Sequence, residues 1–324
     1  MRAIVQDAWG TDPAATLEIR ELDRPTIDDD AVLVRVIAAS VDRGTVHCMT
    51  GQPYAMRLMG FGLRRPKAPN PGRALAGTVA SVGKNVQGYE PGDEVYGSCD
   101  GSFAEYASAQ PGMLARKPAN LSFEQASAAP ISGVTALQAV RKAGVATGKH
   151  VLVVGASGGV GTFAVQIAKA LGAEVTGVCS TGKVELVRSI GADHVIDYTR
   201  EQISDGGRRY DVILDIGGNR TLSELRSALS ERGALVIVGG ETGGRWLGGF
   251  DRSLRAVLLS PFVTQSLSLL ASKENTADLD ELRALIETEG VVPTVDRAYP
   301  LSEAAAAILD VQNGRTRGKA VIAV

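Results

Sequence analysis

The sequence predicts an α/β protein with two domains, one β-rich and one built on a doubly wound parallel sheet. Three observations support this class. The chain has 324 residues, more than the roughly 100–200 residues usual for one domain. Its first part contains short alternating or β-branched runs separated by turn formers. From about residue 150, apolar strands alternate with helical patterns, which is typical of parallel sheets covered on both faces.

In the first part of the chain we expect strands at residues 31–37, 76–82 and 103–107, where the runs alternate or are β-branched. Turn formers separate them, notably Asn70-Pro71-Gly72 and Glu90-Pro91-Gly92-Asp93. This part, to about Pro118, is therefore expected to be compact and rich in loops.

The second part begins at Ser122-Phe123-Glu124-Gln125, which resembles a capping box displaced by one position and precedes helical spacing that runs to Arg141. The alternation after it predicts strands at 150–154, 173–178, 195–196, 211–215 and 234–238, and helices at 160–171, 183–190 and 222–229. A helix at 278–289, a strand, a helix at 302–309 and a strand at 320–324 complete the chain.

Composition and charge favour an ordinary globular protein that acts on a small molecule. The chain is 44% hydrophobic and 22% charged, with a formal net charge of -2, which provides no electrostatic footprint for nucleic acid or an anionic membrane. No apolar run reaches about 18 residues and polar residues follow Met1 closely, so we expect a cytoplasmic protein. The three cysteines, Cys48, Cys99 and Cys179, are odd in number and widely spaced, which argues for packed thiols rather than disulfides.

Residues 155–161 read Gly-Ala-Ser-Gly-Gly-Val-Gly, follow an apolar strand and open an alanine-rich helix. Glycines let the backbone approach a diphosphate, and the free N–H groups at a helix start face the anion. Ala156 breaks the strict G-x-G-x-x-G pattern, and a glycine turn that only packs against the sheet is the alternative. The candidate cofactor contacts here are Gly155, Ser157, Gly158, Gly159, Val160 and Gly161.

The end of the next strand favours NADPH as the cofactor. Folds that select NAD place a carboxylate about 20 residues beyond the glycines, where it binds the ribose hydroxyls. Here residues 178–183 contain no carboxylate. Ser180 can donate to a 2′-phosphate and Lys183 can neutralise it. The alternative is that Lys183 only begins a solvated helix face.

Four runs, at residues 155–173, 191–198, 91–95 and 317–321, together resemble the quinone oxidoreductase branch of the medium-chain dehydrogenase/reductase superfamily. The resemblance covers essentially the whole chain. It implies a GroES-like catalytic domain at 1–122 and 273–324, a Rossmann dinucleotide-binding domain at 123–272, and an active site in the cleft. It also implies a homodimer joined at an edge strand, for which residues 263–270 are the candidate.

The resemblance implies further cofactor contacts. They are Thr135 beside the nicotinamide, Tyr198 against the adenine, Gly217, Gly239 and Gly240 at strand ends that border the cofactor, and Lys319 near the end of the chain. The run 240–250 follows a strand and is a candidate border of the substrate pocket. It includes Glu241, Thr242, Gly243, Trp246 and Phe250.

The zinc ligands of the zinc-dependent relatives are replaced in this sequence. Those relatives hold the metal with a cysteine of a GxCGxDxH-type loop and with the His-Glu of a GHE motif. Here Asp42 stands for the cysteine, and Arg73 and Ala74 stand for the histidine and glutamate. A catalytic zinc needs three good protein ligands, so we predict no metal. His47 beside Cys48 is interpreted as ordinary loop chemistry.

Without a Lewis acid, the acceptor must be polarised by hydrogen bonds. This suits quinones and α,β-unsaturated carbonyls, because hydride adds to carbon while negative charge collects on oxygen. Zinc-free members of the family often carry Asn, Asp and Tyr in the first cleft loop, where this chain has Asp42, Thr45 and His47. We hypothesise that His47 or Tyr54 donates a hydrogen bond or proton to the developing enolate oxygen.

The sequence thus predicts a zinc-independent, NADPH-dependent oxidoreductase that transfers hydride to a quinone or α,β-unsaturated carbonyl. Two alternatives stay open: a specialised biosynthetic enoyl reductase of the polyketide type, and a non-catalytic NADPH-binding regulatory protein. Zinc-assisted alcohol chemistry is a further alternative. The expected partners are a small-molecule substrate and a second copy of the chain, with no nucleic acid or membrane.

Overall fold

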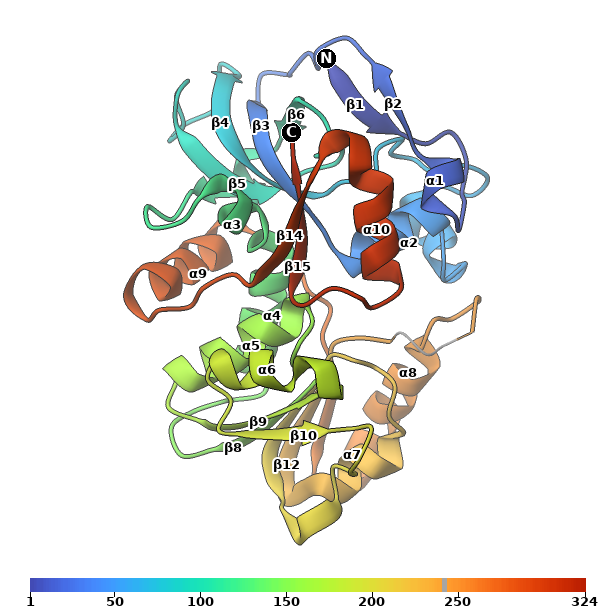
Figure 1. Ribbon diagram of the computed structural model, residues 1–324, viewed down its shortest axis with the longest axis vertical. Coiled ribbons are helices and arrows are strands. Elements are labelled where there is room, and N and C mark those ends of the chain that lie inside the picture. The colour runs from blue at the N-terminus through green and yellow to red at the C-terminus, as the bar shows by residue number, and fades with distance from the viewer. Residues whose placement is uncertain (241–243) are drawn as a thin grey trace. The chain divides into compact units, whose positions relative to one another are not determined.

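The computed structural model describes residues 1–240 and 244–324. The chain divides into two compact units, Met1–Val134 with Glu274–Val324, and Thr135–Lys273. The division falls inside one helix, α4 (Pro130–Lys142), whose residues therefore belong to both units. The predicted α/β class is confirmed, with a β-rich unit and a unit built on a parallel sheet (Figure 1).

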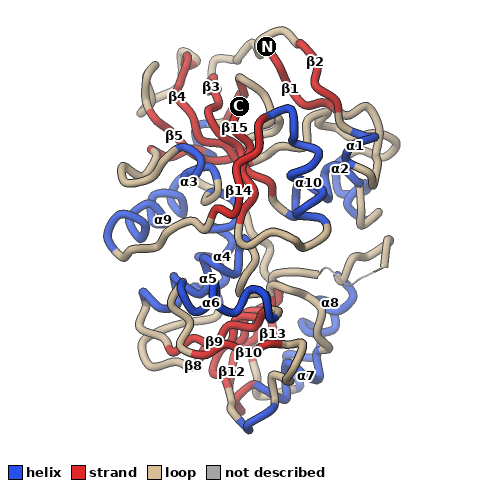
Figure 2. The backbone as a smooth tube through the Cα atoms, in the orientation of Figure 1, coloured by secondary structure: helices blue, strands red, loops and turns tan. Residues whose placement is uncertain are grey.

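The remaining α-helices of the described residues are α1 (Pro13–Thr16), α2 (Arg43–Thr50), α3 (Phe123–Ser127), α5 (Gly159–Ala170), α6 (Val184–Ser189), α7 (Leu222–Ala228), α8 (Phe250–Leu259), α9 (Thr276–Thr288) and α10 (Ala304–Gln312). The strands are β1 (Arg2–Val5), β2 (Glu18–Glu21), β3 (Val32–Val41), β4 (Ala74–Val82), β5 (Glu94–Ser98), β6 (Tyr106–Ala109), β7 (Leu114–Arg116), β8 (His150–Val154), β9 (Glu174–Cys179), β10 (His194–Asp197), β11 (Tyr210–Asp215), β12 (Leu229–Ile237), β13 (Ser266–Leu269), β14 (Val295–Pro300) and β15 (Lys319–Ala323). Figure 2 separates helices, strands and loops by colour.

The first unit is built on a mostly antiparallel sheet. Within the described residues its strand order is β14-β15-β3-β4-β5-β7, with β6 also paired to β3. Strand β15 near the end of the chain lies between β14 and β3, and Ala320 pairs with Val41. Side chains from distant parts of the chain, such as Val34, Leu75 and Ile322, are fully buried in one core. The last strand is therefore an integral part of this sheet.

The second unit contains a doubly wound parallel sheet. In the part of the chain that the structure describes, its strand order is β10-β9-β8-β11-β12-β13, and each pairing is parallel. Helices α5 and α6 pack against β8, β9 and β10, while α7 and α8 pack against β12 and β13 on the other face (Figure 1). The strand order reverses at β8, and ligands of such sheets bind at this reversal, outside the carboxyl ends of the strands.

Local signals account for several boundaries. The Oγ of Ser122 accepts a hydrogen bond from the Gln125 N–H, at 3.2 Å, and the Gln125 Oε1 accepts one from the Ser122 N–H, at 3.1 Å. This is a regular capping box at the start of α3, so the predicted displacement by one position is wrong. Residues 103–107 form a strand only from Tyr106 onward, because Ala104 makes just an isolated bridge with Ala3.

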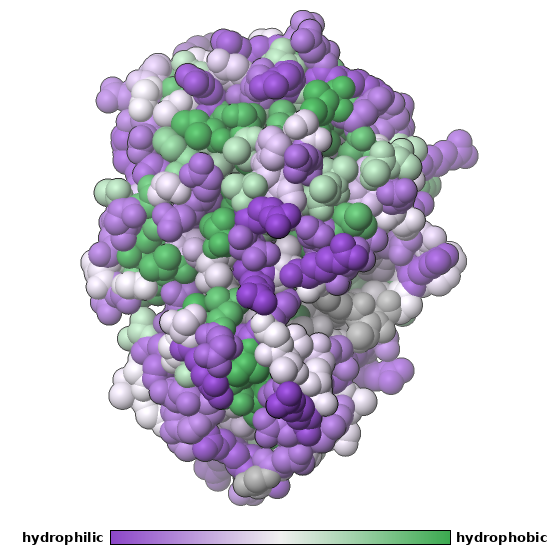
Figure 3. All heavy atoms as spheres, in the orientation of Figure 1, coloured by the Kyte–Doolittle hydropathy of each residue, from purple (hydrophilic) through white to green (hydrophobic). Residues whose placement is uncertain are grey.

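In the described part of the chain, no helix is long and apolar enough to cross a membrane. On the face shown in Figure 3, hydrophilic residues cover most of the surface and hydrophobic residues form separate patches between them. This surface is consistent with the composition of an ordinary globular protein.

Candidate active site

The turn after β8 has the geometry of a phosphate-binding turn. Strand β8 lies between β9 and β11 in the sheet, and α5 begins at Gly159 with Gly158 as its N-cap. Because Gly158 has no side chain, the N–H groups in the first turn of α5 have no side-chain cap. Such groups, together with the positive end of the helix dipole, bind anions. Residues 155–161 therefore lie together as the sequence predicts.

The glycines of this turn serve different purposes. Gly155 has a φ of +85°, and a Cβ on it would lie 2.9 Å from the Gly217 N. A Cβ on Gly161 would lie 2.1 Å from the Gly155 O, so no larger residue fits there. A Cβ on Gly158 would meet only the Gly155 O, at 3.5 Å. Packing within the described residues therefore requires Gly155 and Gly161, whereas Gly158 keeps open a space that a ligand could occupy.

The predicted adenosine contacts meet at the end of β9. Ser180 and Lys183 follow this strand directly. The Tyr198 N–H donates to the Cys179 O at 3.1 Å, which brings Tyr198 beside them. The Tyr198 side chain is exposed, so its ring is available to stack. The structure thus places Ser180, Lys183 and Tyr198 at one end of β9 and β10.

Asp197, at the end of β10, is a residue of this site that sequence reasoning missed. Its carboxylate accepts hydrogen bonds from the Thr181 Oγ1, at 2.6 Å, and from the Thr199 N–H, at 3.0 Å. The hydrogen bond from Thr181 holds the pKa of Asp197 below its usual range. Asp197 is therefore ionised and holds in place the turn that carries Ser180 and Lys183. Its signal in the sequence was an Asp at the end of a strand, followed closely by a threonine.

The ends of β11 and β12 present bare backbone next to the glycine turn. The Gly217 N–H donates to the Val154 O at 3.0 Å. A Cβ on Gly239 would lie 2.0 Å from the Ile216 O. The carboxyl ends of β8, β11 and β12 therefore approach each other as closely as glycine allows. Gly240 follows in the same turn.

The candidate pocket border is only partly described. Glu241, Thr242 and Gly243 lie outside the described residues. Trp246 is 74% exposed and Phe250 is 43% exposed, so neither is a core residue of the second unit. Thr135, predicted beside the nicotinamide, is half-buried in α4, where its Oγ1 donates to the Ser272 Oγ at 3.1 Å.

In the first unit, Asp42, Ser132 and Lys319 form a buried polar cluster. The Ser132 Oγ donates to the Asp42 Oδ1 at 2.8 Å, and the Lys319 Nζ is ion-paired with the same oxygen. The side chains of Lys319 and Asp42 are 2% and 6% exposed. Asp42 is also the N-cap of α2, and its N–H donates to the buried Thr45 Oγ1 at 3.2 Å. The candidate catalytic residue Asp42 and the candidate cofactor contact Lys319 are therefore each other's partners.

The candidate proton donors lie in α2 and in the segment that follows it. The Nδ1 of His47 is 2.7 Å from the Gln52 O. A carbonyl oxygen only accepts, so this nitrogen carries a proton and the neutral ring has its lone pair on Nε2. The Tyr54 ring stacks under the Arg57 guanidinium, 4.7 Å from its centroid. Both donors are half-buried side chains of the first unit.

The side chains at the positions of zinc ligands do not fit zinc. The Arg73 guanidinium stands where a histidine ligand would be and lies 3.4 Å from the Glu274 Oε2. Burial raises the pKa of the Cys48 thiol and raises that of Cys99 to about 12. Among the described residues, no three His, Cys, Asp or Glu side chains are grouped as metal ligands.

Comparisons with known proteins agree with this architecture. Residues 28–119 match the family model of the alcohol dehydrogenase GroES-like domain. Residues 190–322 match the model described as zinc-binding dehydrogenase. The first match falls in the β-rich unit, and the second includes the later strands of the parallel sheet and the end of the chain.

The chain is similar along most of its length to curated reductases. It is 32% identical to 2-methylene-furan-3-one reductase of Solanum lycopersicum, over 97% of this chain and 78% of the relative. It is 32% identical to the chloroplastic NADPH-dependent alkenal/one oxidoreductase of Arabidopsis thaliana, over 92% of this chain and 73% of the relative. The solved structure of Escherichia coli quinone oxidoreductase complexed with NADPH superposes with a TM-score of 0.82 and 25% identity, covering 100% of both chains. The protein is an NAD(P)H-dependent oxidoreductase that belongs to the medium-chain dehydrogenase/reductase superfamily, in its quinone oxidoreductase-like branch.

Proposed function

We propose that the protein is a zinc-independent, NADPH-dependent oxidoreductase whose acceptors are quinones or α,β-unsaturated carbonyl compounds. The observation that carries this proposal is the turn of residues 155–161, where Gly158 leaves the start of α5 open beside the reversal of the strand order. The names of the two plant reductases and of the NADPH-bound quinone oxidoreductase support the choice of cofactor and acceptor.

The order of the strands gives the cofactor a direction. A dinucleotide held at the reversal places one half on each side of β8. Ser180, Lys183 and Tyr198 on the β9 side suit the adenosine half and its 2′-phosphate. The bare backbone at Gly217 and Gly239 on the β11 and β12 side suits the nicotinamide half. Thr135 is the proposed side-chain contact to the nicotinamide.

The proposed reaction requires hydrogen-bond donors from this chain rather than a nucleophile. Bound NADPH would supply the hydride to a carbon of the acceptor. As negative charge collects on the acceptor oxygen, His47 or Tyr54 would donate a hydrogen bond or proton to it. The proton that His47 carries on Nδ1 is engaged by the Gln52 O, so donation from His47 requires a second proton, on Nε2.

Zinc independence rests on the side chains present. Asp42, at the position of the cysteine ligand, has its carboxylate paired with Lys319. Arg73, at the position of the histidine ligand, is a cation, and a guanidinium cannot be deprotonated to bind a metal. No step of the proposed reaction passes through a metal ion.

Calorimetry followed by an acceptor panel tests the proposal. NADPH should bind more tightly than NADH, and Lys183→Met should remove most of this preference, because it removes the charge beside the 2′-phosphate. NADPH oxidation should then be measured with quinones, enals and enoyl thioesters. Turnover confined to thioesters would favour the biosynthetic reductase, and binding without any turnover would favour a regulatory protein. No association with either reduced nucleotide would contradict the proposal.

We also propose that the protein forms a homodimer through β13. This strand is the last of its sheet among the described residues, and unpaired sheet edges readily pair with another chain. Light scattering should give twice the monomer mass of 33.8 kDa. Leu269→Pro, at the end of β13, should reduce the mass to that of the monomer, because the Leu269 N–H faces away from β12, the next residue, Leu270, donating to the Ile237 O; a monomeric unmodified protein would contradict the proposal.

A further inference from the structure

Arg252, in the first turn of α8, extends across the ends of two strands of the parallel sheet. Its guanidinium lies 2.6 Å from the Asp215 Oδ2 and donates to two backbone carbonyls, the Arg220 O at 2.7 Å and the Gly239 O at 3.0 Å. The arginine side chain is 14% exposed and that of Asp215 is fully buried. One buried cation therefore joins the last residue of β11, the turn that follows β11, and the turn that follows β12.

The Asp215 carboxylate connects this arginine to the glycine turn after β11. Its Oδ1 accepts a hydrogen bond from the Gly218 N–H at 3.3 Å. The intervening Gly217 N–H donates to the Val154 O, at the end of β8. The position of the bare backbone at Gly217 therefore depends on a carboxylate whose counter-ion is Arg252.

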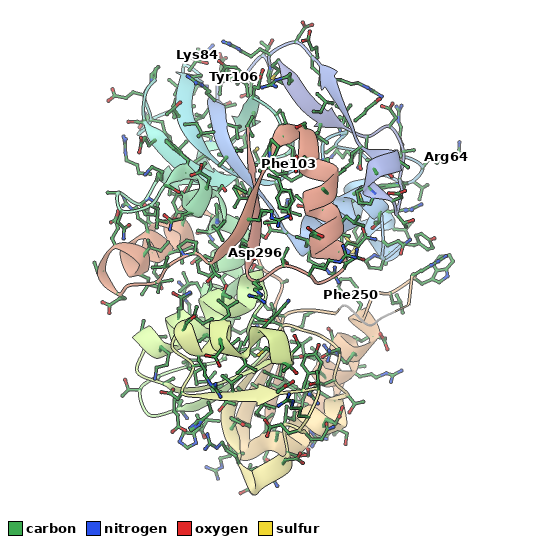
Figure 4. All side chains as sticks on the ribbon, in the orientation of Figure 1. Arg64, Lys84, Phe103, Tyr106, Phe250 and Asp296 are labelled. Atoms are coloured by element: carbon green, nitrogen blue, oxygen red, sulfur yellow. The ribbon has the colours of Figure 1, made fainter. Side chains whose placement is uncertain are left out.

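Arg252 also donates a hydrogen bond near the start of the segment between β12 and α8, at the Gly239 O. A Cβ on Gly240 would lie 2.7 Å from the Gly248 O, and a Cβ on Gly249 would lie 2.8 Å from the Gly240 Cα. The two ends of this segment are thus in backbone contact. Phe250, labelled in Figure 4, opens α8 directly after this contact. Arg252, in the first turn of α8, donates to the Gly239 O. This hydrogen bond joins α8 to the chain beside the contact between Gly240 and Gly249.

We propose that Arg252 is a positioning residue for the nicotinamide half of the cofactor. It holds Gly217 and Gly239 at the spacing that lets their backbone border the ring, and it makes no contact with the residues at the adenosine end of the sheet. This inference rests on the proposed function, because it assumes NADPH at this sheet edge. Multiple hydrogen bonds from one planar guanidinium fix geometry as well as charge, so lysine cannot replace it fully.

The test compares two ligands and three variants. The ligands are NADPH and adenosine 2′,5′-bisphosphate, which contains only the adenosine end of the cofactor. The variants are Arg252→Met, Arg252→Lys and, as a matched control, Arg255→Met. Arg255 lies on the same helix, is 77% exposed and only approaches Asp251, at 3.8 Å. Binding is measured by calorimetry at a temperature at which circular dichroism shows each variant to be folded.

Arg252→Met should weaken NADPH binding roughly 10- to 100-fold, the range expected when hydrogen bonds from a charged group are lost. Its affinity for adenosine 2′,5′-bisphosphate should equal that of the unmodified protein. Arg252→Lys keeps a charge beside Asp215, so it should fold even if Arg252→Met does not, and it should show a smaller loss with the same selectivity. Arg255→Met should bind both ligands normally.

Two results would overturn the inference: unchanged NADPH affinity in folded Arg252→Met or Arg252→Lys, or an equal loss of affinity for both ligands, which marks a purely structural role. Failure of the proposed function would give a different result, because the unmodified protein would then bind no NADPH at all. In that case the role proposed for Arg252 would be wrong as well.

Discussion

A single hydrogen bond limits what His47 can do. Its Nδ1 faces the Gln52 O at 2.7 Å, and this contact fixes both the tautomer and the orientation of the ring. The same contact joins α2 to Gln52, which follows shortly after the end of the helix. A histidine held in this way can serve as a donor whose direction does not vary between turnovers.

Replacing the two candidate donors separates their roles. We expect His47→Phe to lower kcat with a good quinone or enone acceptor by about 100-fold, since general acids contribute about 10²–10⁴. Tyr54→Phe retains the ring that stacks with Arg57 and removes the hydroxyl. Steady-state kinetics checks both variants. Unchanged turnover in both would show that neither side chain is the donor.

The thiols should be unreactive at neutral pH. Burial raises the pKa of Cys179 to about 11 and that of Cys99 to about 12. A raised pKa keeps the thiol protonated below that value, so the reactive thiolate increases about tenfold with each pH unit up to it. Alkylation with iodoacetamide, followed by mass spectrometry, should be slow at pH 7 and much faster at pH 9. Rapid labelling of Cys179 at pH 7 would contradict this assignment.

At the scale of the element, the turn between β8 and α5 provides a matched pair of substitutions. Gly161→Ala should destabilise the protein, because its Cβ would lie 2.1 Å from a backbone oxygen. Gly158→Ala should leave the melting temperature nearly unchanged, because its nearest neighbour would be at 3.5 Å. It should nevertheless weaken NADPH binding, since its methyl group would occupy the space proposed for the diphosphate. Calorimetry and thermal melts together check the pair; normal NADPH binding by Gly158→Ala would place the diphosphate elsewhere.

Elements with local signals were predictable from the sequence, and elements stabilised by distant contacts were not. The strand, turn and helix around residues 150–170 follow from apolar periodicity and glycines alone. Helix α2 contains Gly44 and the β-branched residues Thr45 and Val46, which are weak helix formers. It forms because Asp42 and Thr45 cap it and because Val46 and Met49 are buried in the core of the first unit.

Helix α8 was missed although it has a local signal. Its apolar residues Phe250, Leu254 and Leu258 repeat with helical spacing, so the sequence carried a local signal that was not used; in the structure these side chains are exposed. The contacts of Arg252 could not be predicted, since they join residues that are distant in sequence. Sequence patterns therefore located the glycine turn of the candidate site and not the side chains that hold its strand ends.

At the scale of the whole molecule, the pair formed by Asp42 and Lys319 connects residues 277 positions apart. No local pattern could indicate this pairing. Both groups are buried, so each depends on the other. The homodimer and the cytoplasmic location expected from the sequence stay predictions.

Removing one charge of this pair should lower the stability of the fold strongly, whereas removing both charges should change it little. Lys319→Met leaves a buried carboxylate without its counter-ion, so we expect the free energy of unfolding to fall by about 3–5 kcal/mol. Adding Asp42→Asn should restore most of that loss, because the unpaired charge is gone while a side chain that can cap α2 is kept. Lys84→Met, at an exposed pair with Asp29, serves as the control and should change little. Urea unfolding measures all variants, and an unchanged Lys319→Met would show that the pair does not stabilise the fold.

The position of β15 between β14 and β3 has a consequence for the newly made protein. Residues 135–273, which form the parallel-sheet unit, are all translated before β14 and β15. Until then residues 38–41 of β3, which pair with β15, have no partner on that side, whereas residues 32–35 already pair with β6. In the nascent chain the parallel-sheet unit is therefore translated in full while the β-rich unit still has an open stretch of sheet edge.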